Sequence, residues 1–258
     1  MKRKIQGLLL ATYRCALATG ILSTRLGSAL FEFSYFKYKV LFEAGEVNLL
    51  RGYVVEGGTV IDVGANIGFF TLNFAEWVGT SGQVLAIEPA QENLERLAYR
   101  LKRYGYSQRV MSIHAAAAEK FGELRMAINP FNPMDHRLSE NGTPVRAITI
   151  DGVCAINDWP PVCLIKIDVQ GAEGRVIAGA IETLKRFGPA LFVEIEETSV
   201  RGDGLGALFL DELTSLGYLP YILRKKGAER VQDMNAAITI VKLNGYADFL
   251  FLKSKDVR

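Results

Sequence analysis

The chain has 258 residues, enough for one large domain or two small ones at about 150 residues per domain. Hydrophobic residues make up 49% and charged residues 22%, an ordinary globular composition that excludes a disordered, collagen-like or low-complexity protein. The 30 Lys and Arg residues against 28 Asp and Glu residues give a net charge of +2. This balance excludes a protein whose whole surface follows nucleic acid phosphates.

The first 40 residues differ from the rest of the chain in charge, because they hold seven basic residues and one acidic residue, Glu32. Their uncharged runs, 5–13 and 15–24, end at Arg14 and Arg25, and both are far shorter than the roughly 20 apolar residues of a membrane span. We expect a helical extension over residues 1–50 with apolar and basic faces. Two interpretations stay open: the helix packs on the main domain, or residues 1–40 contact a membrane surface or a lipid-linked substrate.

Three cysteines and two histidines form neither a zinc-binding pattern nor a disulfide framework. We therefore expect no metal and a reducing, cytoplasmic location, with peripheral attachment to the membrane as a further option. Cys163 lies in an apolar run, where a small buried hydrophobe is a more common role than a reactive thiol.

From Gly58 onward, short β-rich runs alternate with longer helical stretches, a pattern typical of parallel βαβ units. We expect one α/β domain over residues 51–258. Its predicted strands are 59–63, 83–88, 109–114, 162–168, 190–195, 218–223 and 248–252, and its predicted helices are 67–77, 90–104, 172–187 and 205–216. Between the third and fourth strands, residues 123–128 and 145–150 predict a hairpin or lid over the sheet.

A glycine-containing turn follows the first strand, at the sheet edge where open α/β folds bind their ligands. Gly64 lets a ligand approach the main chain without a Cβ in the way. A dinucleotide-binding turn reads GxGxxG, but Asn66 and Phe69 stand at two of the glycine positions, which disfavours NAD. Glu88 ends the second strand, where its carboxylate can accept both hydroxyls of an adenosine ribose. The alternative for Glu88 is a solvated strand end.

Several segments occur in the order known from one enzyme family. They are Val60 to Phe70, Ala-Ile-Glu-Pro at 86–89, His-Ala-Ala-Ala-Ala-Glu at 114–119, Ile-Thr-Ile-Asp at 148–151, Ile-Lys-Ile-Asp-Val-Gln-Gly-Ala-Glu at 165–173 and Val-Glu at 193–194. Together they resemble the FkbM family of class I S-adenosylmethionine-dependent methyltransferases. The resemblance implies a Rossmann-like, seven-stranded, mostly parallel sheet flanked by helices, with S-adenosylmethionine as cofactor. It also implies O-methylation of a hydroxyl on a sugar, polyketide or related small molecule.

The resemblance further implies which residues contact the cofactor: Asp62, Gly64, Asn66, Gly68, Glu88, Ala117 and Asp168. The chain departs from the family at Gln170, where Glu is common, and at His114, where Asn is frequent. We expect His114 to be a satisfied histidine at a strand end and do not assign it to the site.

Methylation of a hydroxyl needs in-line positioning of the acceptor and benefits from a general base, but it requires no metal. Asp168, Glu173, Glu194 and His136 are the candidate bases at the carboxyl edge of the sheet. Glu173 has a simpler explanation in the helix dipole, and Asp168 has one in capping the next helix. We assign the catalytic role to Asp168 or His136.

Two other functions compete with this interpretation. A nucleic acid methyltransferase would carry Asp/Asn-Pro-Pro-Tyr/Phe after the fourth strand, where this chain has Asp-Val-Gln-Gly at 168–171. A binding module that has lost catalysis would keep the cofactor residues without a usable base. We therefore expect a small-molecule or glycan acceptor and no nucleic acid partner.

Overall fold

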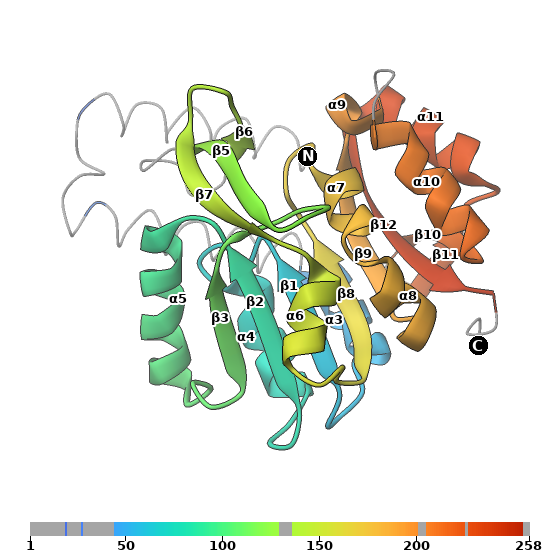
Figure 1. Ribbon diagram of the computed structural model, residues 1–258. Coiled ribbons are helices and arrows are strands. Elements are labelled where there is room, and N and C mark those ends of the chain that lie inside the picture. The colour runs from blue at the N-terminus through green and yellow to red at the C-terminus, as the bar shows by residue number, and fades with distance from the viewer. Residues whose placement is uncertain are drawn as a thin grey trace.

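The computed structural model describes residues 44–128, 136–200, 205–224 and 227–254, together with Thr19 and Gly27. Its centre is an eight-stranded sheet in the order β11-β10-β12-β9-β8-β1-β2-β3 (Figure 1). The strands are β1 Thr59–Val63, β2 Gln83–Glu88, β3 Val110–His114, β8 Val162–Ile167, β9 Ala190–Glu196, β10 Tyr218–Arg224, β11 Gly227–Arg230 and β12 Tyr246–Lys253.

Five neighbouring strands, β3, β2, β1, β8 and β9, run parallel, while β12 is antiparallel to both β9 and β10. The connections change direction between β1 and β8, which makes this the switch point where wound sheets bind ligands. This is the class I, Rossmann-like arrangement expected from the sequence, with one correction. The sheet has eight strands instead of seven, because the short β11 pairs with β10 at the edge.

The central strands have continuous apolar runs because helices cover both faces of the sheet. Every residue of β1 is buried, and its side chains alternate between two core clusters. On one face lie α3 Ala44–Leu50, α4 Phe69–Trp77 and α5 Gln91–Tyr104. A 3-10 turn, Arg51–Tyr53, lies between α3 and β1. On the other face lie α6 Ile150–Ile156, α7 Glu173–Ala178, α8 Ile181–Phe187, α10 Leu205–Ser215 and α11 Met234–Asn244.

The single helix predicted over 172–187 is wrong, since the structure has two helices, α7 and α8, in that range. The break includes Gly179, where an added Cβ would collide with the carbonyl oxygen of Ala118. Helix α8 then starts under the carboxylate of Asp151, which accepts the backbone N–H groups of Glu182 and Thr183 at 2.9 and 2.8 Å. Gly179 is thus the C-cap of α7, a local signal for a helix end, and the close approach of Ala118 leaves no room for a larger residue there.

The segment between β3 and β8 forms a second sheet in the order β4-β7-β5-β6, which confirms the predicted hairpin. Its strands are β4 Ala116–Ala117, β5 Gly122–Ile128, β6 His136–Leu138 and β7 Thr143–Ile148. Because β4 begins two residues after β3 ends, this sheet starts at the carboxyl edge of the central sheet. Figure 1 shows β5 and β7 standing above that edge. We call this small sheet the lid.

The predicted extension over residues 1–50 lies largely outside the described residues, and its domain boundary stays a prediction. Helix α3 is described, and its Val47 and Leu50 are buried in the core. Within the described ranges, no helix is both long and apolar enough to span a bilayer. Cys163 is half-buried and packs against the core, and burial raises the pKa of its thiol.

Candidate functional site

The turn between β1 and α4, Gly64 to Gly68, has an unusual backbone. Gly64, Asn66 and Gly68 all have positive φ angles, of 73°, 52° and 92°. A Cβ on Gly64 would collide with the carbonyl oxygen of Asp168, and a Cβ on Gly68 would collide with the Leu97 side chain of α5. The absent side chain of Gly64 leaves room for the loop after β8, and the predicted approach of a ligand to the Gly64 backbone stays a prediction.

Glu88, at the end of β2, holds this turn from one side. Its Oε2 accepts the backbone N–H of Asn66 at 2.8 Å. Its Oε1 accepts the backbone N–H of Ala90 and the side-chain amide of Asn93, both at 3.0 Å. The residue is only 2% exposed, which excludes the solvated strand end considered above. Burial raises the pKa of Glu88 from 4.5 to about 7, although the hydrogen bonds and the Lys166 ammonium oppose this shift.

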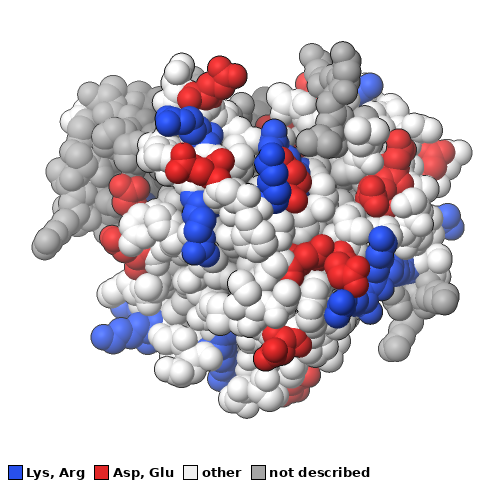
Figure 2. Space-filling model, viewed as in Figure 1, with Lys and Arg blue, Asp and Glu red and all other residues white. Residues whose placement is uncertain are grey.

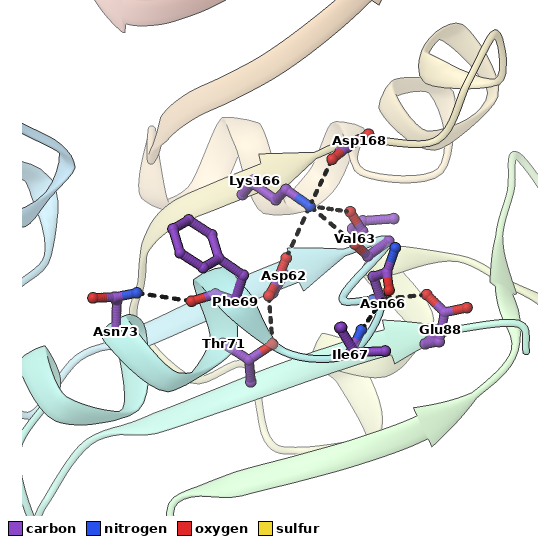
Figure 3. A network of polar contacts seen from close by, with 11 residues as sticks. Asp62, Val63, Asn66, Ile67, Phe69, Thr71, Asn73, Glu88, Lys166 and Asp168 are labelled. Carbon is purple, nitrogen blue, oxygen red and sulfur yellow. Dashed lines mark hydrogen bonds and ion pairs between the residues drawn. The ribbon is translucent and has the colours of Figure 1, made fainter. Parts of the chain in front are cut away.

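Lys166, on β8, holds the same turn from the other side (Figure 3). Its Nζ donates to the carbonyl oxygen of Gly64 at 2.9 Å and lies 5.0 Å from the centre of the Phe70 ring. The ammonium also lies 3.4 Å from Asp62 Oδ1 and 3.4 Å from Asp168 Oδ2. The sequence analysis missed Lys166, although a lysine within an otherwise apolar strand was the available signal.

Asp62 lies beneath the turn and is completely buried. Its Oδ2 accepts the hydroxyl of Thr71 at 2.6 Å, and its Oδ1 faces Lys166. The sequence predicts that Asp62 contacts the cofactor, and this contact stays a prediction. In this structure its carboxylate is enclosed by α4 and β8, so its visible role is to neutralise Lys166 and to attach the first turn of α4.

Asp168 follows β8 directly and faces the turn. Its backbone N–H donates to the Val63 carbonyl at 3.1 Å, and its side chain is 31% exposed. Two residues later, Gln170 and Gly171 have positive φ angles of 46° and 92°. The loop from Asp168 to Gly171 thus combines an exposed carboxylate with a constrained backbone, a combination common at functional sites.

Glu173 supports this loop from inside the protein. It is fully buried, accepts the Gly171 N–H at 2.9 Å, and accepts a short hydrogen bond from the Ser199 hydroxyl of α9 Glu197–Val200. Burial raises the pKa of Glu173 above its usual value. The structure therefore uses Glu173 as a brace between the loop and α9.

The remaining candidate bases lie on β9, beside β8, and on β6 of the lid. Glu194 is half-buried on β9, directly opposite Asp248 of β12. His136 begins β6, opposite Ile128, which places its backbone in the lid, but its side chain lies outside the described residues. Asp168 contacts the network around the glycine turn through Lys166.

Comparison with known proteins adds a family to this geometry. The family model described as the methyltransferase FkbM domain matches residues 62–220, more than half of the chain. The chain belongs to the FkbM methyltransferase family. Among curated protein sequences none matches.

Solved structures give weaker likenesses. The FkbM methyltransferase from Methylobacillus flagellatus KT is 20% identical, covers 77% of this chain and has a TM-score of 0.47; this chain covers 44% of that protein's length. The SAM-dependent O-methyltransferase from Thermotoga maritima is 17% identical and has a TM-score of 0.44. The match covers 82% of this chain and 65% of that protein. An O-methyltransferase from Bacillus cereus, solved in complex with SAH, is 13% identical and has a TM-score of 0.47. The match covers 82% of this chain and 81% of that protein. The family assignment therefore rests on the family model, and the fold on the strand order.

Some segments that resemble the FkbM family have a structural role in this chain. Thr149 caps α6 by accepting the Gly152 N–H at 2.9 Å, and Asp151 caps α8. His114 contacts the Pro89 carbonyl at 2.9 Å through Nε2, which confirms the expected satisfied histidine. Ala117 is nearly buried in β4, paired with Ile148 of the lid, and its predicted cofactor contact stays a prediction.

An ion pair connects the end of the lid's first strand to α7. Arg175 donates to Glu119 Oε1 at 2.8 Å, and both side chains are partly exposed. The lid is thus attached to the helix that follows the Asp168 loop.

Proposed function

We propose that this FkbM methyltransferase uses S-adenosylmethionine to methylate a hydroxyl group of a sugar, polyketide or related small molecule. The observation that carries the cofactor assignment is the buried carboxylate of Glu88 beside a turn with three positive φ angles. This carboxylate accepts three protein hydrogen bonds and lies at the carboxyl edge of the sheet on β2, one strand from the switch point between β1 and β8, where its remaining acceptor position can take a ligand hydroxyl.

The acceptor capacity of Glu88 fits a ribose. A carboxylate has about four acceptor positions, and three donors already use Glu88. One ribose hydroxyl can therefore bind Oε2 directly. A second hydroxyl can bind only by displacing one of the three donors. The side-chain amide of Asn93 can rotate away, whereas the N–H groups of Asn66 and Ala90 belong to the backbone and are fixed.

The residues of this chain accept the proton and position the acceptor. When bound, S-adenosylmethionine would supply an electrophilic methyl group, and the C–O bond to the acceptor would form as the S–CH3 bond breaks and S-adenosylhomocysteine leaves. Asp168, partly exposed beside the turn, accepts the hydroxyl proton as the new bond forms. Positioning of the acceptor between the Asp168 loop and the lid supplies the entropic part of the rate acceleration.

On one face of the described part of the chain, the charges favour a small acceptor over a nucleic acid. On the face shown in Figure 2, acidic and basic residues are interspersed among large uncharged areas. Nucleic acid binding typically needs a basic patch or stripe.

Calorimetry with S-adenosylhomocysteine and with NAD tests the cofactor. We expect heat from the first ligand and none from the second; the reverse result contradicts the assignment. Transfer of a labelled methyl group to a panel of sugars, polyketides, amines and carboxylic acids then tests the acceptor class. We expect an alkali-stable methyl ether. Label found only on amines, or only as alkali-labile esters, contradicts O-methylation of a hydroxyl, and binding without any transfer supports the non-catalytic module.

A further inference from the structure

We propose that Lys166 is a positioning residue that holds the cofactor-binding turn and the Asp168 loop in one fixed arrangement. This inference rests on the proposed function, because it concerns binding of S-adenosylmethionine. Lys166 does not itself contact the cofactor in this proposal. It acts through the Gly64 carbonyl on one side and through the Asp168 carboxylate on the other.

The first argument comes from the strand order. Strand β1 lies between β2 and β8, and the turn after β1 is held from both neighbours. From β2, the Glu88 carboxylate accepts the Asn66 N–H. From β8, the Lys166 ammonium donates to the Gly64 carbonyl. A buried anion thus binds an N–H group and a buried cation binds a C=O group of the same short turn (Figure 3).

Lys166 is only 2% exposed, so its ammonium group has been removed almost completely from water. An ammonium in a protein interior must be paired, and unpaired burial costs several kcal/mol. The protein meets this cost with Asp62 Oδ1 at 3.4 Å, and Asp62 is itself anchored by Thr71. A methionine and an asparagine would fill the same space without charges. Stability alone does not require this pair, since uncharged replacements of buried ion pairs are often neutral or stabilising.

The third argument is the position of the ammonium between two carboxylates of different exposure. Asp62 is fully enclosed, whereas Asp168 is 31% exposed, and both lie 3.4 Å from Nζ. The backbone of Asp168 also presses against Gly64, where no Cβ fits. Any shift of the turn therefore moves Lys166 and Asp168 together, so that the cofactor side and the acceptor side of the site stay aligned.

The test uses a paired substitution, Asp62→Asn with Lys166→Met, which removes both buried charges and keeps the side-chain volumes similar. Lys166→Met alone leaves Asp62 as an unpaired buried charge and is expected to lower the melting temperature strongly. The double variant is expected to melt near the wild-type temperature. Its affinity for S-adenosylhomocysteine, measured by calorimetry, should fall about tenfold to a hundredfold, the value of a hydrogen bond from a charged donor.

A second measurement separates positioning from general support of the fold. The Lys166 ammonium lowers the pKa of Glu88, so the midpoint of the pH dependence of S-adenosylhomocysteine affinity should lie at higher pH in the double variant than in Asp62→Asn alone, which keeps the ammonium. The control is Arg224→Met with Glu229→Gln, which removes one charge of each sign from an exposed pair at the edge of the sheet. This control should keep both the affinity and the midpoint.

The outcomes are distinct. Weaker binding and a raised midpoint in a stable double variant support the positioning role. Wild-type affinity and an unchanged midpoint in that variant overturn it and leave the proposed cofactor intact. Failure of the wild-type protein to bind S-adenosylhomocysteine overturns the proposed function and this inference together.

Discussion

The protonation of Glu88 makes the stability of this protein depend on pH in a direction that one substitution can isolate. In the folded protein the pKa of Glu88 is raised from 4.5 to about 7 because the carboxyl group is buried. The folded state therefore retains a proton that the unfolded chain releases at lower pH. Stability falls as the pH rises between these two values, since the unfolded state binds fewer protons in that window.

The size of the effect follows from the two pKa values. The interval from 4.5 to about 7 is about 2.5 pH units, and each unit corresponds to about 1.4 kcal/mol. The contribution of Glu88 to the free energy of unfolding should therefore decrease by about 3 kcal/mol between pH 4.5 and pH 8, with most of the change below pH 7. Glu88→Gln removes the titration but retains the shape of the side chain.

The assay is urea denaturation of the wild type and the Glu88→Gln variant at several pH values from 4.5 to 8. Glu173 also has a raised pKa from burial, so it contributes a slope of the same sign. Glu173 is present in both proteins, and its contribution cancels in the difference between them. The difference in unfolding free energy should decrease with pH by about 3 kcal/mol.

Binding should follow the opposite trend, because the ionised carboxylate accepts the ribose hydroxyls. Below pH 7 the affinity of the wild type for S-adenosylhomocysteine should fall by up to about tenfold per pH unit. The Glu88→Gln variant should bind more weakly at pH 8 and show little pH dependence. A stability difference that stays constant from pH 4.5 to 8 would refute the reasoning, because Glu88 would then titrate alike in the folded and unfolded chains.

Three further predictions concern the turn, the base and the extension. Gly64→Ala should lower the melting temperature and abolish S-adenosylhomocysteine binding in calorimetry, because the added Cβ collides with the Asp168 carbonyl oxygen. The control Gly52→Ala places its Cβ in open space and should change neither quantity. Asp168→Asn should reduce the rate of single-turnover methyl transfer by about 10²-fold or more and change cofactor affinity only a few-fold. Wild-type rates in both Asp168→Asn and His136→Ala would exclude both residues as the general base. Deletion of residues 1–25 should preserve cofactor binding, since the cofactor motifs begin after Val60. If the extension contacts membranes, only the full-length protein should sediment with anionic liposomes, and equal sedimentation of both proteins would eliminate that interpretation.

Much of the central sheet could be predicted because buried parallel strands have long apolar runs. The predicted strand over 83–88 agrees with β2 at both ends, and the one over 59–63 agrees with β1. The edge strand β11 has no comparable signal, since its four residues are exposed or half-buried. The break between α7 and α8 falls at Gly179, a local helix-end signal in the sequence, whereas the close approach of the Ala118 carbonyl to this glycine is a feature of the tertiary structure.

The site divides in the same way. Local sequence determined the glycine turn, the carboxylate at the end of β2 and Asp168 after β8, because each follows directly from a strand end and its neighbouring residues. Only the tertiary structure decided what these groups do to one another. Lys166 is 104 positions from Asp62 and meets it because β8 lies beside β1. Burial between these two strands makes Asp62 the counter-charge of Lys166, and burial at the end of β2 lets Glu88 take up a proton near neutral pH, whereas Asp168 stays partly exposed. Desolvation depends on neighbours that no single segment contains.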